Sequence, residues 1–431
     1  MQETNNEQPS AAVAAAPKQA EETRDRWWWV ERCVWTERML TRLTAGEPAN
    51  RVWFSLLDKT YAPANLRSAF QQVWRNGGSA GADKQTVAHF AQQAERELAQ
   101  LHAQLRDGKY QPQPVRRAWI PKPGSQERRP LGIPAVRDRI VQGALRHVLE
   151  PIFETEFAGQ SYGFRPGRGA KDALREVDEL LHAGYDWVVD ADLKAYFDTI
   201  PQDRLLALVQ ARVADGRVLA LVESFLRAGV LEECKGWQPT ETGTPQGGVI
   251  SPLLANLYLN PLDHQMAQAG WKMVRYADDF VILCRSEGEA QAALCQVQDW
   301  VKAAGLTLHP EKTRIVPAAQ PGGFDFLGYH FERGRKWPRE KSLKKLKDRI
   351  RQKTPRRDGR SWKEIVAGAS TAAPTCSRTW TVLSGDDCAA SSKSDAAVPG
   401  KDSAKPINAG PTNGLLNMDY CPWQNSMNIR G

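Results

Sequence analysis

Three aspartates lie at the ends of short apolar segments, where their carboxylates can be brought together. Asp192 ends the segment 187–192, and Asp278 and Asp279 are adjacent between two apolar arms. One acid at a strand end and two at a neighbouring hairpin tip can share two divalent ions, about 3.5–4 Å apart, which stabilise the attacking and leaving oxygens of a phosphoryl transfer. Because Mg²⁺ prefers hard oxygen ligands, an acid-only set favours two Mg²⁺ ions and no zinc.

Adjacent aspartates are also ordinary turn residues, so Asp278 and Asp279 alone leave a plain hairpin turn open. Their flanks weigh against that alternative. Val274, Tyr276 and Phe280 make both arms strand-like, and burying two carboxylates between such arms is costly without a cation. We therefore expect a metal site at this turn.

The elements that must position these acids alternate between short strands and amphipathic helices. Strands are expected at 115–120, at 187–192, on both sides of Asp278 and within 324–331. Helical spacing covers residues 52–105, 139–153, 171–182, 205–227, 243–260 and 287–304. Helices packed on a small, largely antiparallel sheet predict an α+β fold.

Positive charge is concentrated in two blocks of this 431-residue chain, whose formal net charge is +8. Residues 331–360 carry 14 Lys and Arg against 4 Asp and Glu, and residues 115–139 carry 7 against 2. Such blocks suit a surface that follows a phosphate backbone. Two solvated basic faces are the alternative that the counts leave open.

The seven cysteines are scattered without a C-x-x-C pair. This argues against a disulfide framework and a zinc site, and it suits a reducing cytosol. The first residues do not have the pattern of a secretion signal. No apolar run approaches the roughly 18 residues of a membrane span. We expect a cytoplasmic, nucleic-acid-associated protein without a membrane partner.

Further motifs surround the acids in a fixed order. They are IPKPG at 120–124, RPLGIP at 129–134, SYGFRPGR at 161–168, DLKAYFD at 192–198, GTPQGGVISPLLAN at 243–256, YADD at 276–279, GLTLHPEKT at 305–313 and FLGY at 326–329. Over residues 26–365 this order resembles the reverse transcriptase/maturases encoded by bacterial group II introns. The resemblance implies a right-hand polymerase fold with helical fingers and a palm built on a small antiparallel sheet. It also implies RNA-directed DNA polymerase activity, linked to intron splicing and retrohoming.

The same resemblance implies the partners and the roles of individual residues. The partners are group II intron RNA, an RNA template with a DNA primer, and dNTPs. Asp192, Asp278 and Asp279 would be catalytic and would ligate two Mg²⁺ ions, with the Leu193 carbonyl as a further ligand. The dNTP would contact Lys122, Arg129, Phe197, Gln246 and Lys312. Template and primer would contact Arg165, Pro245, Gly247, Phe326, Leu327 and Gly328.

Several of these roles have a plainer alternative. Phe197 would reject a ribose 2′-hydroxyl by steric clash, or it is a core aromatic. Lys122 and Arg129 would hold the triphosphate, and Lys312 would donate a proton to pyrophosphate; all three could be ordinary surface cations. Residues 244–248 are expected to begin a helix whose N–H groups suit a phosphate or a template strand.

The chain is expected to have five parts. They are a disordered lead-in at 1–25, an N-terminal helical fingers extension at 26–102, the fingers and palm at 103–330, the basic start of a thumb or maturase region at 331–365, and a non-family tail at 366–431. A helix over 342–350 would place Leu343, Leu346 and Ile350 on one face. Beyond 365 the composition turns to Ala, Ser, Thr, Gly and Pro, which predicts disorder and an incomplete thumb.

The break near residue 366 motivates the hypothesis of a shifted reading frame, which an intact thumb in another frame downstream would support. Two rivals to an active polymerase follow from these observations. One is an RNA-binding splicing cofactor that does not polymerise, and the other is an inactive remnant of a mobile element. Intact acids at 192, 278 and 279 weigh against the first rival, and the tail favours the second.

Overall fold

The computed structural model describes residues 25–44, 52–121, 128–232 and 235–353. The chain divides into two compact units, one up to Trp337 and one from Pro338. The described part of the second unit is helix α14 (Glu340–Lys353), which confirms the helix expected over 342–350. The tail at 366–431 and nearly all of the lead-in lie outside the described residues, so their expected disorder stays a prediction.

Asp192 and Asp279 lie in a four-stranded sheet that is antiparallel throughout, as predicted, and Asp278 lies in a turn of that sheet. Its strand order is β6–β7–β3–β8. The strands are β3 (Trp187–Asp192), β6 (Lys272–Tyr276), β7 (Asp279–Cys284) and β8 (Arg314–Pro317). Five consecutive residues of β7 are buried, because both faces of the sheet are covered. That double coverage explains the continuous apolar run in the sequence.

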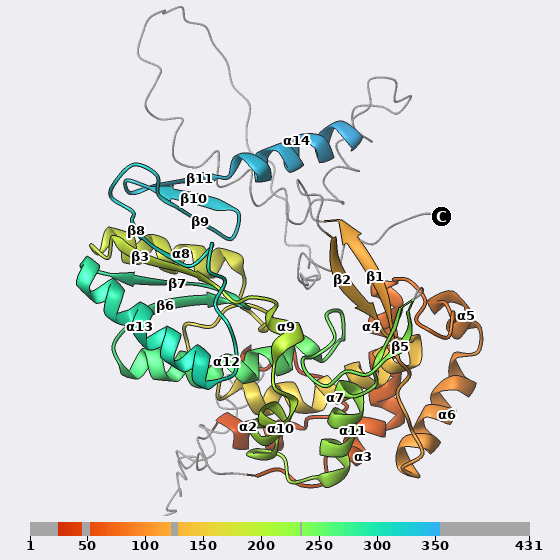
Figure 1. Ribbon diagram of the computed structural model, residues 1–431. Helices are drawn as coiled ribbons and strands as arrows, with labels where there is room; N and C mark the ends of the chain where they lie inside the picture. Colours follow the sequence, from red (N-terminus) through yellow and green to blue (C-terminus); the bar gives the residue numbers. More distant parts are fainter. Residues whose placement is uncertain (1–24, 45–51, 122–127, 233–234, 354–431) are drawn as a thin grey trace, which may run out of the picture. The chain divides into compact units, whose positions relative to one another are not determined.

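Each face of this sheet packs against its own set of elements (Figure 1). Helices α12 (Ser251–Gln268) and α13 (Glu287–Ala303) contact one face, where Val189 and Ile282 join the larger core. Helix α8 (Ala170–His182) and strand β9 (Phe324–Phe326) contact the strands from the other side, where Val188 and Val281 join a smaller core. Because side chains alternate along a strand, the face of Val188 is also the face of Asp192.

A second four-stranded sheet, in the order β2–β1–β4–β5, belongs to the expected fingers. Its strands are β1 (Val115–Pro121), β2 (Arg128–Ile133), β4 (Val230–Glu232) and β5 (Gly236–Gln238). The accompanying helices are α2 (Glu37–Thr44), α3 (Leu57–Tyr61), α4 (Pro63–Asn76), α5 (Val87–Gln92), α6 (Ala94–Arg106) and α7 (Val136–Glu154). A third sheet joins β9 to β10 (Tyr329–Glu332) and β11 (Arg335–Pro338).

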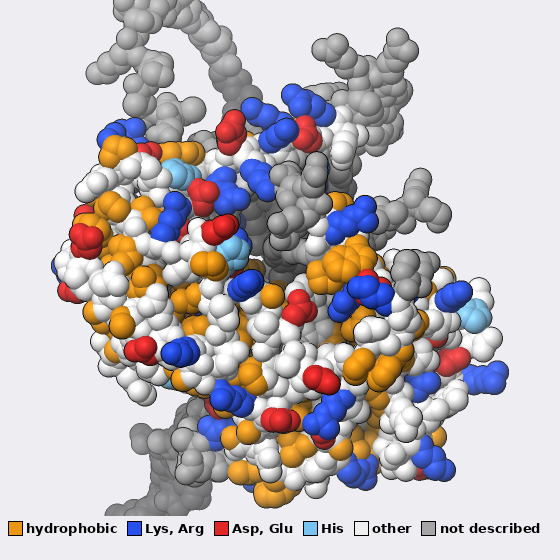
Figure 2. Space-filling model, viewed as in Figure 1, with side chains coloured by type: hydrophobic (Ala, Val, Ile, Leu, Met, Phe, Trp, Pro, Cys, Tyr) orange, Lys and Arg blue, Asp and Glu red, His pale blue; other side chains and the backbone are white. Residues whose placement is uncertain are grey.

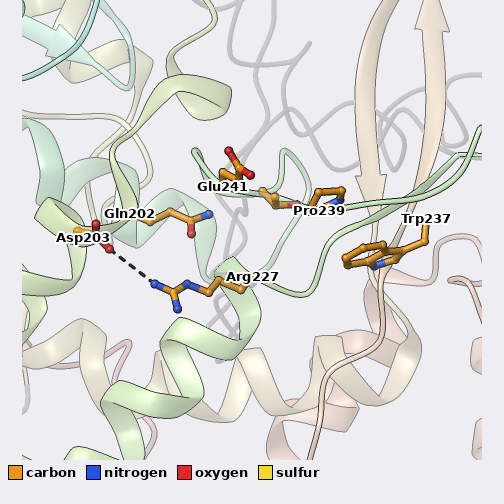
Figure 3. Close-up of a pocket in the computed structure, with 7 residues that line it drawn as sticks. Gln202, Asp203, Arg227, Trp237, Pro239 and Glu241 are labelled. Carbon is orange, nitrogen blue, oxygen red and sulfur yellow. Dashed lines mark ion pairs between the residues drawn. The ribbon is translucent and has the colours of Figure 1, made fainter.

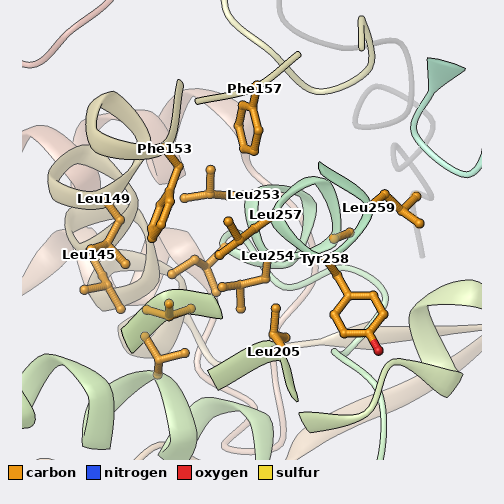
Figure 4. Close-up of a cluster of buried hydrophobic side chains, with 14 of the residues drawn as sticks. Leu145, Leu149, Phe153, Phe157, Leu205, Leu253, Leu254, Leu257, Tyr258 and Leu259 are labelled. Atoms are coloured by element: carbon orange, nitrogen blue, oxygen red, sulfur yellow. The ribbon is translucent and has the colours of Figure 1, made fainter. Parts of the chain in front are cut away.

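The larger core joins α7 to α12 through buried leucines and aromatics. Leu145, Leu149 and Phe153 on α7 meet Leu253, Leu254 and Leu257 on α12 (Figure 4). The outer surface is mixed: Figure 2 shows basic, acidic and apolar side chains interspersed on the face in view. In the described part of the chain, no helix is long and apolar enough to cross a membrane.

One predicted helix is interrupted in the structure. The segment 205–227 is not one helix but two, α10 (Gln202–Gln210) and α11 (Gly216–Leu226), after the short α9 (Tyr196–Thr199). The break lies at Asp215, whose carboxylate caps α11 and also accepts hydrogen bonds from the Leu56 and Leu57 N–H groups. A capping residue satisfies N–H groups that have no partner within the helix, so it favours a helix start there.

Candidate active site

Strand register places Asp192 opposite Asp279. The two residues are cross-strand partners in the β3–β7 ladder. In the β6–β7 hairpin Tyr276 pairs with Asp279, so Ala277 and Asp278 form the two-residue turn between the strands. The structure therefore brings together the three acids that the sequence predicted to act together.

The turn itself has an unusual backbone. Ala277 has φ +61°, a left-handed conformation that costs free energy for a residue with a side chain. Gly163 lies directly against it: a Cβ on Gly163 would be 2.3 Å from the Ala277 nitrogen. Only a glycine permits this close approach, and the amide of Asn256 donates to the Gly163 carbonyl at 2.7 Å.

Burial raises the pKa of both acids of the hairpin, Asp278 and Asp279. It raises the pKa of Asp279 to about 7, and the negative charges of Asp190, Asp192 and Asp278 add to the effect. Burial, and then the charge of Asp192, also raise the pKa of Asp278. Buried carboxylates that repel one another are stabilised by a divalent cation, which reverses the local cost of ionisation.

The donor chemistry of the three acids fits magnesium. Within the described ranges, no group of three or more His, Cys, Asp or Glu side chains is arranged to hold a metal ion. Magnesium, however, is commonly held by one or two carboxylates together with water and substrate phosphates. The oxygen-only set of Asp192, Asp278 and Asp279 is compatible with that kind of shared site.

The segment 305–313 runs beside Asp192 and delivers Lys312 to it. The His309 N–H donates to the Asp192 carbonyl at 2.8 Å, and the Lys194 N–H donates to the Thr307 carbonyl at 2.8 Å. These two bonds flank Leu193, whose own carbonyl belongs to neither. The ammonium of Lys312 forms an ion pair with the Asp192 carboxylate, so the predicted proton donor lies at the predicted metal ligands.

Phe197 is partly buried at the edge of the larger core. Its ring centroid is 5.6 Å from that of Tyr196 and 6.5 Å from that of Phe164. Helix α9, which carries Phe197, follows Ala195 at φ +50°. The position is compatible both with a sugar gate and with the plainer role of a core aromatic, so the gate stays a proposal.

The segment 244–248 is a turn ahead of α12 and not the start of the helix, which begins at Ser251. The Thr244 hydroxyl donates to the Ser251 hydroxyl at 2.8 Å, and the Ser251 hydroxyl donates to the Pro245 carbonyl at 2.8 Å, so these bonds hold the turn against the first residue of α12. The side-chain amide of Gln246 donates to the Asp198 carboxylate at 3.2 Å. The main-chain carbonyl of Gln246 accepts from the Gly132 N–H at 2.6 Å. The turn thus links β2 to α9.

Gly247, a predicted template contact next to Pro245, explains why this link is close. Its φ is +110°, and a Cβ there would lie 2.2 Å from the Gly132 carbonyl oxygen. The neighbouring Arg129 pairs through its backbone with Ile120 in the β1–β2 hairpin. The side chain of Arg129 and all of Lys122 lie outside the described residues, so their triphosphate role stays a prediction.

Arg165 does not have the position expected of a template contact. It is 8% exposed, and its guanidinium donates to the Glu154 carboxylate and to the carbonyls of Ala158 and Ser161. Its charge is also stacked over the ring of Phe157. Because these internal partners use the donors that a phosphate would need, we assign Arg165 to holding its own loop.

The expected primer-binding hairpin is formed by β9 and β10, but its three residues differ in exposure. Phe326 is 1% exposed and belongs to the smaller core. Leu327 and Gly328 form the turn, with φ of +47° and +85°. A primer contact from this hairpin is therefore open to Leu327 and Gly328 but not to the buried ring of Phe326.

Residues that the sequence reading missed lie behind the catalytic turn. Arg275 is fully buried, and its guanidinium bonds to Asp263, Asn256 and Ser161. A signal was present in the sequence, because Asn256 and Asp263 are polar residues seven positions apart in an apolar helix and therefore share one face. Asp190 was also missed; it lies on the same face as Asp192 and pairs with Arg314.

A separate pocket lies between α10, α11 and the segment after β5 (Figure 3). Its lining residues are Gln202, Asp203, Arg227, Trp237, Pro239, Thr240 and Glu241. Arg227 pairs there with Asp203 at 3.7 Å. None of these residues is among the predicted catalytic, metal or nucleotide residues, so the pocket is not part of the candidate active site.

Comparisons with known proteins show the family of this chain. The reverse transcriptase (RNA-dependent DNA polymerase) family matches residues 120–331. Group II intron-encoded protein LtrA of Lactococcus lactis subsp. cremoris is 40% identical over 246 residues, which cover 56% of this chain and 40% of LtrA. Protein YkfC of Escherichia coli (strain K12) is 36% identical over 278 residues, which cover 56% of this chain and 72% of YkfC. This chain thus spans less than half of LtrA but most of YkfC. It belongs to the reverse transcriptase/maturases of group II introns.

Proposed function

We propose that this chain is an RNA-directed DNA polymerase that extends the 3′-hydroxyl of a DNA primer on an RNA template. Each step would add a dNMP and release pyrophosphate. The observation that carries the proposal is the register that sets Asp192 against Asp279, with Asp278 in the adjoining turn. Membership of the reverse transcriptase family supports it.

Asp192, Asp278, Asp279 and the Leu193 carbonyl would hold two Mg²⁺ ions. When bound, such ions stabilise negative charge on the attacking and leaving oxygens. The carboxylates of Asp278 and Asp279 must be ionised to serve as ligands, which their raised pKa opposes until a cation is present. Lys312 would hold a proton at Nζ for the departing pyrophosphate, after release from its ion pair with Asp192.

The residues around the acids would bind the nucleotide and the two strands. Phe197 would lie under the sugar of the dNTP, and Gln246 would contact the newly formed base pair. Lys122 and Arg129 would bind the triphosphate. Pro245, Gly247 and the turn formed by Leu327 and Gly328 would contact template and primer.

We further propose that the chain works on group II intron RNA, in splicing and in retrohoming, in the bacterial cytoplasm. The names of the relatives support this: one is a group II intron-encoded protein, and one from Arabidopsis thaliana is a mitochondrial nuclear intron maturase. We propose three functional domains: the N-terminal extension at 26–102, the fingers and palm at 103–330, and the thumb start at 331–365. The frame-shifted tail stays a hypothesis.

Primer extension tests the polymerase proposal directly. The full chain is incubated with an RNA template, a DNA primer, dNTPs and Mg²⁺, and is compared with Asp278→Asn, which keeps the side-chain volume but loses the charge. We expect a loss of about 10²- to 10³-fold, as for other charge-stabilising groups in transfer reactions. Asp203→Asn is the matched control, because it removes an exposed acid from α10.

Equal extension by the wild type and Asp278→Asn would refute the proposal, as would no extension by the wild type at high concentration. Binding of intron RNA by a wild type that extends no primer would instead favour the non-polymerising splicing cofactor. Failure of both binding and extension would favour the inactive remnant.

A further inference from the structure

Arg275 is a buried cation directly before the catalytic turn. It is the last buried residue of β6, lies two residues before Ala277, and is 0% exposed. The sheet carries it into a region where water cannot solvate the guanidinium. A charge in such a place is costly unless it is paired and hydrogen-bonded.

Asp263 of α12 supplies the pairing. It is also 0% exposed, and its two carboxylate oxygens accept from Nε and Nη2 of Arg275 in a two-pronged contact. Buried ion pairs of this kind often contribute no more stability than apolar side chains of the same volume. The pair therefore calls for a role beyond stabilising the fold.

The remaining donors of Arg275 reach the catalytic turn and its supports. Nη1 donates to the Ala277 carbonyl at 2.8 Å and to the Asn256 side-chain oxygen at 3.0 Å. Nη2 donates to the Ser161 hydroxyl at 2.7 Å. The fixed planar fork of a guanidinium can satisfy these partners together, whereas the single ammonium of a lysine cannot.

The partners close a circuit around the turn. Asn256 donates in turn to the Gly163 carbonyl at 2.7 Å, and Gly163 lies against the Ala277 nitrogen. The Tyr162 N–H donates to the Arg275 carbonyl at 2.9 Å. The buried Arg275 side chain thus connects α12, the loop at 160–165 and the hairpin. In the hairpin it bonds to Ala277, which has a left-handed backbone.

We propose that Arg275 is the positioning residue of the catalytic turn. Through the Ala277 carbonyl it holds Asp278 and Asp279 at the place where they share divalent ions with Asp192. It touches no substrate itself. The inference rests on the proposed polymerase site, and it predicts a defect in metal binding as well as in turnover.

The test compares Arg275→Lys and the charge-neutral pair Arg275→Gln/Asp263→Asn with the wild type. The neutral pair keeps polar groups in place and leaves no unpaired buried charge, so it separates folding from positioning. Mn²⁺ binding is measured by electron paramagnetic resonance without nucleic acid, and amide exchange is measured over 276–279. The matched control is Arg146→Gln/Glu150→Gln, an ion pair on α7.

Both Arg275 variants are expected to fold, to exchange faster at 276–279 and to bind Mn²⁺ about 10-fold or more weakly, the usual effect of losing a group that orients metal ligands. In primer extension kcat should fall by a similar factor or more, with the KM for dNTP nearly unchanged. The control should match the wild type in all of these.

Folded variants that match the wild type in Mn²⁺ affinity and in exchange at the turn would overturn the proposal. So would a neutral pair that fails to fold, since Arg275 would then be a residue of the folding core. If the wild type binds Mn²⁺ and the variants do not, but the wild type extends no primer, the positioning role would be supported and the polymerase proposal would fail.

Discussion

Asp192 and Asp279 are cross-strand partners at the end of the β3–β7 ladder, and Asp190 follows one pair further along on the same face. Like charges directly opposite one another destabilise a sheet. The protein nevertheless places them there, beside the partly buried Asp278. This arrangement lowers the stability of the folded chain without a cation, and a bound cation would offset that loss. The effect of a cation on stability can therefore be measured.

Stability should depend on pH and on divalent metal together. Asp279 has a pKa of about 7 in the folded chain against 3.8 in the unfolded chain. Between about pH 4 and pH 7 the folded state binds the extra proton, so its stability decreases as pH rises through this window. Mg²⁺ should therefore raise Tm at pH 8 and have little effect at pH 5.

Thermal unfolding at both pH values, with Mg²⁺ or with EDTA, measures this effect. In Asp279→Asn the decrease in Tm between pH 5 and pH 8 should be smaller than in the wild type. Its metal-free Tm at pH 8 should exceed that of the wild type. A Tm gain from Mg²⁺ that is the same at pH 5 and pH 8, or the same in Asp279→Asn, would contradict the assignment.

Gly163→Ala should impair turnover more than folding. Its Cβ would meet the Ala277 nitrogen at 2.3 Å, so the turn must shift, and a displacement of about 1 Å at reacting groups can cost about 10²-fold in rate. Gly159→Ala in the same loop is the control, because a Cβ there meets no atom within 4 Å. Single-turnover primer extension compares them, and equal rates would show that the contact does not position the acids.

Phe197→Ala should raise incorporation of ribonucleotides relative to deoxyribonucleotides, because the ring no longer blocks a 2′-hydroxyl. The readout is the ratio of kcat/KM for rNTP and dNTP. Tyr196→Phe is the control: it keeps the neighbouring ring and removes only the hydrogen bond to the Ala255 carbonyl. An unchanged ratio in Phe197→Ala would leave this residue as a core aromatic.

Lys312→Gln should slow the chemical step by about 10²-fold or more, as expected when a general acid is lost. It should change stability by less than about 1 kcal/mol, because exposed ion pairs contribute little and the lysine side chain is 61% exposed. Rapid-quench kinetics and denaturant unfolding measure the two effects. A rate equal to that of the wild type would exclude the proton-donor role.

Arg165→Gln should lower stability and leave RNA affinity unchanged. The substitution removes the partner of the partly buried Glu154, and an unpaired buried carboxylate costs several kcal/mol at most. The measurement is Tm together with the salt dependence of RNA binding, whose slope reports the phosphates contacted. A smaller slope in Arg165→Gln would restore the template contact that the structure disfavours.

The strands that end or begin at the acids, and the family, could be predicted from the sequence alone. Hydrophobic alternation and helical spacing are properties of neighbouring residues, so the strand ending at Asp192 and the helix after residue 287 could be predicted locally. The motif order around them made the assignment specific. The length of single helices was less secure, because Asp215 interrupts one of them through bonds to residues far away in the chain.

What the buried charges contact follows from the tertiary structure. The polar face of α12 signals buried partners for Asn256 and Asp263 but does not identify them, and the residues around Arg165 and Arg275 do not indicate which carboxylate pairs with each arginine, Glu154 with the first and Asp263 with the second. The same holds for Lys312, whose partner Asp192 is distant in the chain. Whether a charge meets solvent, substrate or another side chain depends on which segments fold against it, and residue type and spacing do not contain that information.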